Sequence, residues 1–492
     1  MNSTVTTDTL SPAPAAVETR ETIVTTAEVD RSSRAPVLLM FVLAAVWFWV
    51  GSLLGMVASI KMHAPDFLSD VSWLTYGRVR PAATNAVVFG FASQAGMAVA
   101  LWLVARLGRN LVQGALFIVV AVLAWNVGVA LGVGGVLMGD GTGYECFEFP
   151  GYSSAVLLVG YLIIGAFTLI TFHGRTERRL YPSMWYVMAA LCWFPWVYAT
   201  VQLLLIFSSV RGVLQIIVAG WAGHNLMSLW LAPLVLAAAY YFMPKAANKP
   251  LHSRALAVFG FWLLAIFGAY GGIPAGTPVP RWVAAVSDAG LVLGVTAVLA
   301  FATNVHLTLQ GVYARVWSDS GAKFFIAGCG AYLVVGLIRA ISVIASIGHP
   351  GALTITSMGT SQLFLLGFVS LVLVGAIYSI SPQLSDRRSE RPSFVGLNFW
   401  LAGLGAILVS MPLIIGGFVQ GQALDNPALN FIDVVRKTVP FMGIATLGSL
   451  LVLVGATVLL VNVCRFSYLS WCSCCISEKP STRFVKISGR GA

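Results

Sequence analysis

The chain has 492 residues, of which 58% are hydrophobic and only 10% are charged, and its formal net charge is +11. Soluble domains are about half apolar and about a quarter charged, so this composition excludes a water-soluble enzyme and a disordered protein as descriptions of the whole chain. Lys and Arg gather in the cytoplasmic loops of membrane proteins, so the basic excess does not indicate a nucleic-acid partner. The composition predicts a polytopic membrane protein.

The two ends of the chain are polar and are expected to lie outside the membrane. Residues 1–35 contain no apolar run, which predicts a disordered cytoplasmic tail without a secretory signal peptide. Residues 465–492 form a basic tail that contains most of a cysteine cluster: Cys464, Cys472, Cys474 and Cys475. The cluster has one Cys-x-x-Cys and no second pair, so reduced thiols are expected rather than zinc ligands, and acylation is the alternative.

Between the tails, residues 36–464 are predicted to form an all-α membrane domain with twelve transmembrane helices. A spanning helix needs about 20 mainly apolar residues, and a closed barrel would show much shorter alternating segments. The expected spans cover residues 36–60, 83–106, 111–138, 151–173, 181–208, 212–243, 255–273, 281–310, 323–347, 354–380, 394–419 and 439–463.

Loop charge predicts the orientation of these spans. Of the 29 Lys and Arg residues, 21 fall on the side that holds both termini, seven fall on the other side, and Arg339 falls inside a span. Because basic residues favour cytoplasmic loops, both termini are expected to face the cytoplasm. The loop at 139–149 carries three carboxylates and is expected to face outward.

Two ionisable side chains are predicted to lie within the membrane. Asp288 is about eight residues inside the outer end of its span, and Arg339 is about nine residues inside the outer end of the next one. Equal depth on consecutive antiparallel helices predicts an intramembrane ion pair between them. The alternatives are a pair that only locks two helices, an Arg339 that snorkels alone, and a transport role for Asp288.

Several short motifs occur along the predicted spans in an order typical of one family. They are residues 72–81 continuing into 84–87, residues 223–225, residues 240–245 with Pro250, Asn304 with 307–309 and Gly311, and residues 346–349. Together they resemble the catalytic subunit of C-type (cbb) haem-copper oxidases, which reduce oxygen in bacterial respiration. The resemblance covers nearly the whole chain and implies the haem-copper oxidase subunit I fold in a bacterial inner (cytoplasmic) membrane.

The resemblance also implies six histidine ligands, three for two haems and three for copper. Only His224 stands at such a position, as a remnant copper ligand. The other five positions carry Ala83, Pro274, Ala275, Ser357 and Gly359. Ala, Gly and Pro side chains offer no donor and Ser is a poor haem ligand, so no cofactor is expected in the family's usual sites.

If the family's geometry holds, the vacated cofactor sites leave a cavity beside His224. The candidates to line it are Trp221, Asn225, Asn304 and His306. Met358 lies between two of the lost-ligand positions, and methionine is able to ligate haem.

Three functions follow from these residues. The favoured one is a redox-inactive, oxidase-like subunit that anchors or assembles partners of a respiratory or electron-transfer complex, such as cytochromes c or a dehydrogenase. The first alternative is an active oxygen or nitric oxide reductase with haem b, copper and unusual ligands. The second is a transporter or a lipid- or quinone-binding protein that uses the vacated cavity. Membrane lipid is the expected environment in every case.

Overall fold

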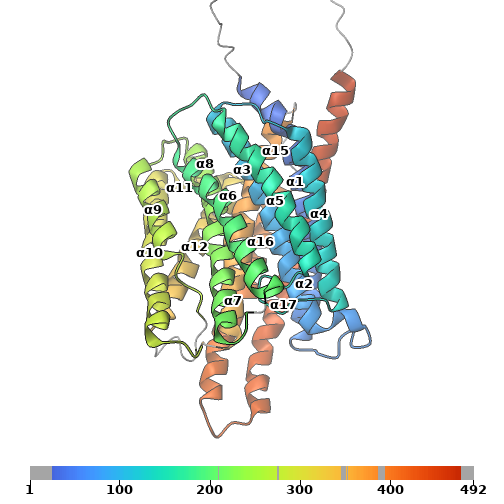
Figure 1. Cartoon of the computed structure of the whole chain (residues 1–492), viewed down its shortest axis with the longest axis vertical. Helices are drawn as coiled ribbons and strands as arrows, with labels where there is room; N and C mark the ends of the chain where they lie inside the picture. Colours follow the sequence, from blue (N-terminus) through green and yellow to red (C-terminus); the bar gives the residue numbers. More distant parts are fainter. Residues whose placement is uncertain are drawn as a thin grey trace, which may run out of the picture.

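The computed structural model describes residues 25–208, 210–273, 276–344, 351, 353–385 and 394–477. Within these residues the chain is all-helical, and eleven helices are long and apolar enough to cross a membrane. They form one upright bundle in which the first and the last helix reach the same end (Figure 1). The protein is therefore a multi-pass membrane protein, as the composition predicts.

The helices follow the expected spans in order. Their bounds are α1 Thr26–Lys61, α2 Tyr76–Asn85, α3 Ser93–Gly108, α4 Ala115–Met138, α5 Gly151–His173, α6 Pro182–Val201, α7 Val213–Asn225, α8 Ala232–Ala247, α9 Arg254–Phe267, α10 Arg281–Leu309, α11 Tyr313–Ser318, α12 Ala322–Ile341, α14 Ile355–Gln362, α15 Leu371–Leu384, α16 Val395–Leu424 and α17 Phe431–Ser477. A short 3₁₀ turn, η1 (Ser72–Leu74), precedes α2, and four π-helical turns continue or join helices: η2 Ala86–Ala92, η3 Gln202–Phe207, η4 Leu226–Leu231 and η5 Leu363–Ser370.

Three of the continuous helices form the centre of the bundle. They run through α2, η2 and α3, through α7, η4 and α8, and through α14, η5 and α15, and most of their residues are buried by other helices. Each contains a π-helical turn in which hydroxyls bind backbone oxygens: Ser93 Oγ donates to the Val88 oxygen at 2.6 Å, and Ser370 Oγ donates to the Leu365 oxygen at 2.8 Å. Such turns collect at functional sites, so they point to this centre.

Small residues let the outer helices approach this centre closely. A Cβ on Gly90 would lie 2.5 Å from the Trp47 side chain, so only glycine admits that indole. The Trp47 Nε1 donates to Asn126 Oδ1 at 2.9 Å, and Asn126 Nδ2 donates to Gln94 Oε1 at 2.8 Å. This network ties α1, α3 and α4 together where water is absent, so each buried polar group has a partner.

Both predicted tails are shorter than the composition suggests. The first helix begins at Thr26 rather than at residue 36, with Thr25 and Glu28 forming a capping box, so residues 26–35 are helical and not disordered. The last helix runs to Ser477, past the predicted boundary at 464. Residues 1–24 and 478–492 lie outside the described residues, as do the side chains of Cys472, Cys474 and Cys475.

Four of the predicted spans differ clearly at their ends from the helices. The span expected over 255–273 is the 14-residue helix α9, which is about 21 Å long and too short to cross a bilayer core. The span expected over 323–347 ends at Ile341. The spans expected over 394–419 and 439–463 are longer than predicted, and α16 and α17 form a hairpin that protrudes from the end opposite to the termini (Figure 1).

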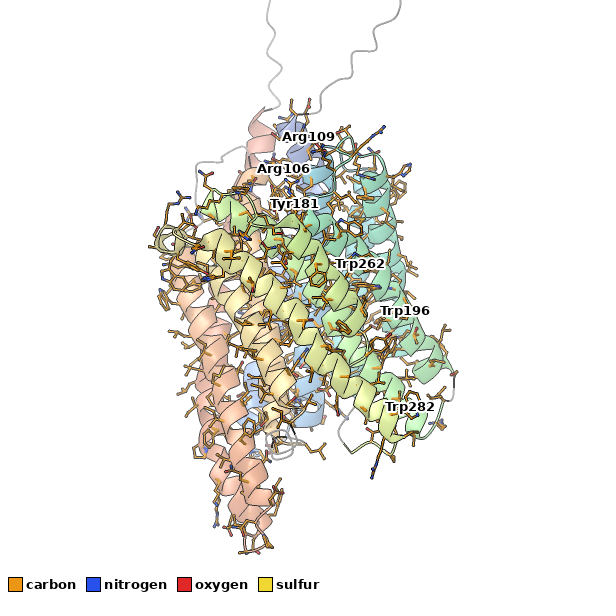
Figure 2. The ribbon with its side chains drawn as sticks, turned by 90° about the vertical axis from the view of Figure 1, so that its left-hand side faces the viewer. Arg106, Arg109, Tyr181, Trp196, Trp262 and Trp282 are labelled. Carbon is orange, nitrogen blue, oxygen red and sulfur yellow. The ribbon has the colours of Figure 1, made fainter. Side chains whose placement is uncertain are left out.

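Basic and aromatic side chains occupy different levels of the bundle. Figure 2 shows Arg106 and Arg109 near the end where α1 begins, and Trp282 near the opposite end. Trp196, Trp262 and Trp282 are each at least half exposed on the outer surface, where lipid would cover them. The location of Trp282 at the start of α10 suits an aromatic anchor at the membrane interface.

Candidate functional site

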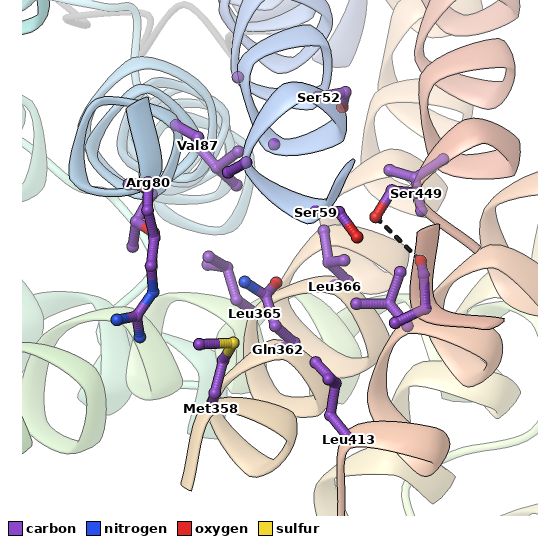
Figure 3. Close-up of a pocket in the computed structure, with 18 of the residues that line it drawn as sticks. Ser52, Ser59, Arg80, Val87, Met358, Gln362, Leu365, Leu366, Leu413 and Ser449 are labelled. Carbon is purple, nitrogen blue, oxygen red and sulfur yellow. Dashed lines mark hydrogen bonds between the residues drawn. The ribbon is translucent and has the colours of Figure 1, made fainter. Parts of the chain in front are cut away.

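Two adjoining cavities lie in the half of the bundle away from the termini. The larger has a volume of about 520 Å³, and the smaller has a volume of about 90 Å³. Both are lined by the same five side chains: Arg80, Thr84, Met358, Gln362 and Leu365. Figure 3 shows Met358 and Gln362 of α14 at the smaller cavity, with Arg80 on the left of the view, on the same side as Met358. These residues form the partition between the two cavities.

The central π-helical turns position this site. Asn85, Asn225 and Gln362 each precede such a turn directly. The Nδ2 of Asn85 donates to the Pro81 oxygen at 2.9 Å, and the Nδ2 of Asn225 donates to the Trp221 oxygen at 2.8 Å. Each of these two amides therefore binds the backbone oxygen four residues earlier, in the last turn of the α-helix that precedes the π-helical turn.

His224 lines the larger cavity but is held by the protein. Its Nε2 lies 2.9 Å from the Gly268 oxygen, and because a carbonyl only accepts, Nε2 carries the proton and Nδ1 is the remaining lone pair. A Cβ on Gly271 would lie 2.8 Å from the imidazole, and one on Gly272 would lie 2.5 Å from His224 Cβ. Two glycines therefore enclose the ring from one side.

The residues beside His224 tie α7 to the end of α9. Trp221 Nε1 donates to the Ala269 oxygen at 3.2 Å, Asn225 Nδ2 donates to the same oxygen at 3.2 Å, and Ser228 Oγ donates to the Gly268 oxygen at 3.1 Å. Trp221 and Asn225 do not line the larger cavity. These two predicted cavity residues therefore position the chain after α9, and sequence reasoning gave them the wrong surroundings.

Asn304 and His306 are also not cavity residues. Asn304 is buried and exchanges two hydrogen bonds with the Ser253 backbone, at 2.7 Å and 3.1 Å, which fixes the start of α9. His306 is exposed, and its Nδ1 lies 3.0 Å from the Tyr313 hydroxyl. The two residues are two positions apart on α10, which turns them to opposite sides of the helix. Their prediction as lining residues was wrong for this reason.

The ion pair expected between Asp288 and Arg339 does not form between these two described residues. Asp288 is exposed on α10, and the Arg339 guanidinium lies 5.2 Å from the centre of the Phe364 ring. Because α12 ends at Ile341, Arg339 lies in its last turn rather than nine residues from its end, so the two side chains are not at equal depth. The prediction was wrong because it extended this helix past Ile341, where α12 ends.

The described lost-ligand positions do not fit haem. Ala83 lines the smaller cavity and offers no donor. Ser357 Oγ donates to the Thr354 oxygen at 3.1 Å. A Cβ on Gly359 would lie 2.7 Å from the Ile414 nitrogen and 2.8 Å from the Ser410 oxygen, so α16 fills the space of any side chain there. The smaller cavity is also below the ~300 Å³ at which ligand pockets begin.

The other predicted ligand positions, Pro274 and Ala275, lie outside the described residues, as does His349. Over the described part of the chain, no group of three or more His, Cys, Asp and Glu side chains is arranged to hold a metal ion. Met358 lines both cavities, and Ala83, which also lines the smaller one, supplies no second axial ligand.

Sequence reasoning missed Arg80 as a site residue and gave Arg339 a different role. Both line the larger cavity, together with Glu145 from the 139–150 loop and Gln215 from α7. The Gln215 amide donates to the Tyr144 hydroxyl, which fastens the loop over the cavity. The sequence does place Arg80 near the start of a span, which is a signal for a functional residue. It does not show that α12 brings Arg339 to the same cavity, so the pair of cations could not be predicted.

The loop also contains a carboxyl that the fold holds in place. Asn85 Nδ2 donates to the side-chain Oε2 of Glu148 at 2.8 Å. The backbone nitrogen of Thr142 donates to the backbone oxygen of Glu148 at 3.1 Å, which holds the residue in the loop. Burial raises the pKa of the Glu148 carboxyl, and the hydrogen bond from Asn85 partly offsets this increase. Burial, with Glu148 and Glu145 nearby, also holds the pKa of the Cys146 thiol well above its usual range, so Cys146 is not a reactive thiolate.

We expect Glu148 to make the stability of the protein depend on pH. An acid with a raised pKa in the folded state contributes stability that is complete below its unfolded pKa, near 4.5, and is lost as the pH rises through the folded pKa. The unfolding temperature of Glu148→Gln, relative to the unmodified protein, should therefore increase between about pH 4 and pH 8.

Thermal unfolding in detergent at several pH values measures this difference. Glutamine keeps an oxygen that accepts from Asn85, so the substitution removes only the charge. Glu145→Gln is the matched control, since it removes a charge from an exposed position of the same loop. A difference between Glu148→Gln and the unmodified protein that stays constant with pH would contradict the raised pKa.

Comparisons with known proteins agree with this architecture. The model of a family described as cytochrome c and quinol oxidase polypeptide I matches residues 35–451. A cytochrome c oxidase subunit 1 homolog of Azorhizobium caulinodans is 26% identical over 452 residues, which cover 87% of this chain and 81% of that one. The cbb3-type cytochrome c oxidase subunit CcoN1 of Stutzerimonas stutzeri is 23% identical over 445 residues, which cover 86% and 93%.

A solved cryo-EM structure of a heme-copper terminal oxidase dimer has the same fold. Its TM-score with this chain is 0.72 at 13% sequence identity, and the match covers 88% of this chain and 84% of the other. The helical bundle is thus shared across sequences that differ at most positions. The likeness to this structure extends to the fold.

Proposed function

The chain belongs to the cytochrome c and quinol oxidase polypeptide I family, and within that family we propose that it is a redox-inactive, oxidase-like membrane subunit. The observation that carries this proposal is the packing at Gly359, where the α16 backbone occupies the space that a ligand side chain would need. Ala83 and Ser357 add no haem donor, and His224 uses Nε2 within the protein. These observations support a subunit that has the helical bundle of the family without the histidine ligands for haem at the described positions.

A subunit of this kind acts through its surfaces. We propose that it anchors or assembles other subunits of a respiratory or electron-transfer complex in the bacterial inner membrane, such as cytochromes c or a dehydrogenase. The α16–α17 hairpin supports this role, because it extends beyond the rest of the bundle and exposes Phe431, Ile432 and Leu424. Exposed apolar side chains beyond a membrane domain are typical of contacts with other proteins.

Purification of the tagged protein from its native membranes in a mild detergent tests the proposal. We expect no Soret band, iron and copper far below one atom per chain, and co-purifying membrane or periplasmic redox subunits. An active cbb-type oxidase, purified from the same membranes in the same way, controls for haem lost during handling. Stoichiometric haem in this chain would contradict the proposal and would favour the reductase with unusual ligands, with Met358 as its first candidate ligand.

A second candidate function has its own observation. The larger cavity has the volume of a typical small-molecule site and contains two arginines, which favours binding of a small molecule over an empty interior.

A further inference from the structure

Two arginines line the larger cavity without a partner for their charge. Arg80 comes from α2 and Arg339 from α12, and both are half-buried. No hydrogen bond or ion pair joins either guanidinium to another of the described residues. Arg339 has only the face of the Phe364 ring, 5.2 Å from its guanidinium carbon. A partly buried guanidinium is costly unless it is paired or reaches water, and no described side chain supplies the pairing charge.

The charge of the lining indicates what would pair with the arginines. Glu145 is the one carboxylate among the residues that line the cavity, and it is exposed and binds neither arginine. For a neutral His224, Glu145 offsets one of the two guanidiniums and the lining carries one net positive charge. A single negative charge on a ligand would balance it. Two guanidiniums also match the two oxygens of one carboxylate, which each arginine is able to bind through paired hydrogen bonds.

Much of the remaining lining is apolar, and its polar members include Thr84, Gln215, Ser361 and Gln362. Ile216 and Met227 come from α7 and η4, and Met358, Phe364 and Leu365 come from α14 and η5. At about 520 Å³ the cavity is large enough for a head group and a hydrocarbon body. Phe364 packs beneath the Arg339 guanidinium, so the polar and apolar parts of the wall are continuous.

From these observations we propose that the larger cavity binds an amphipathic monocarboxylate. Arg80 and Arg339 bind its head group, and its hydrocarbon body lies against Met358 and Leu365. This site is separate from the assembly role proposed above and does not depend on it. If the protein contains no haem and binds no carboxylate, only the carboxylate site is contradicted. If the protein contains haem and binds carboxylate, only the redox-inactive assembly role is contradicted.

Decanoate is the probe, added to the full-length protein in a non-ionic detergent. Isothermal titration and thermal unfolding should show saturable binding and a higher unfolding temperature. Decanol and decyltrimethylammonium carry the same chain with a neutral and a cationic head, and neither should bind at this site. Equal stabilisation by all three compounds would show only partition into the micelle and would overturn the proposal.

Matched variants locate the site. Arg339→Gln and Arg80→Gln should each weaken decanoate binding about tenfold or more, since each removes a charge-assisted contact. Arg281→Gln removes an exposed arginine at the start of α10 and should leave binding unchanged. A similar loss in Arg281→Gln would show that net charge, and not the cavity, attracts the probe.

A blocking variant keeps the test valid if the arginine variants do not fold. Gly223 lines the cavity, and a Cβ there would meet only the Glu145 oxygen, at 3.6 Å. Gly223→Leu should therefore fold and fill the cavity while both arginines remain, and decanoate binding should be lost. Undiminished binding in a folded Gly223→Leu would overturn the proposal.

Discussion

Replacing Gly359 by histidine will destabilise the protein and will not restore haem binding, although this position matches a ligand position of the family. A Cβ here would lie 2.7 Å from the Ile414 nitrogen and 2.8 Å from the Ser410 oxygen. Both atoms belong to the α16 backbone, which is unable to move aside as a flexible side chain would. Overpacking of this kind costs about 1–3 kcal/mol for small additions, and the imidazole is large enough to reach or exceed that range.

The measurement compares unfolding temperatures in detergent for alanine and histidine at two glycines. At Gly330, in the neighbouring helix α12, an added Cβ meets nothing within 4 Å. Gly330→Ala and Gly330→His should therefore be tolerated, whereas Gly359→Ala should already lower the unfolding temperature and Gly359→His should lower it further. A stable Gly359→His with a Soret band would show that α14 still has space for a haem ligand.

This packing changes how the missing histidines are interpreted. If ligand loss were only a matter of side-chain identity, the helices would keep their separation and the haem space would remain open. The smaller cavity, next to Ala83 and Met358, holds only about 90 Å³. The backbones of α14 and α16 are in direct contact at Gly359. They are also in contact at Gly417, where a Cβ would lie 2.2 Å from the Thr356 nitrogen. These contacts leave no space for a haem ligand between the two helices.

The order of the helices could be predicted because each span is an apolar run between charged loops. Helix ends could not be predicted equally well. The apolar run at 255–273 continues past Phe267, but the helix stops there because the following backbone oxygens bind α7 side chains instead. The end of α12 was also placed too late, because apolar residues after Ile341 suggested a longer helix.

The site shows the same limit in its side chains. His224, a polar residue within a long apolar run, lines the larger cavity, and the sequence suggested a cavity there only through the resemblance to the family. Asn304 and His306 have the same signal but lie on opposite sides of α10, away from the cavity. Helical phase relative to the neighbouring helices decides which polar residues converge, and a single sequence does not contain those neighbours.

Removing Asp30 will be among the most destabilising single changes at the end of the bundle that holds the termini. Asp30 lies in α1, at a position expected to be a disordered tail, and pairs with Arg106 of α3, at the last residue of an expected span. The Asp30 side chain is 4% exposed and that of Arg106 is 19% exposed. Trp102 Nε1 also donates to Asp30 Oδ1, at 3.3 Å. Breaking a buried pair leaves an uncompensated charge, which costs about 3–5 kcal/mol.

Three variants, compared by unfolding in detergent, separate the buried charge from the loss of a contact. Asp30→Ala should show the full effect, and Asp30→Leu combined with Arg106→Met should recover part of it because no charge is left buried. Asp433→Ala is the control, since Asp433 and Arg436 form an exposed pair at 3.5 Å and its loss should change stability by less than about 1 kcal/mol. Equal losses for Asp30→Ala and Asp433→Ala would mean that water reaches Asp30. A large loss for Asp30→Ala alone would show that the start of α1, although rich in polar residues, is part of the folded bundle.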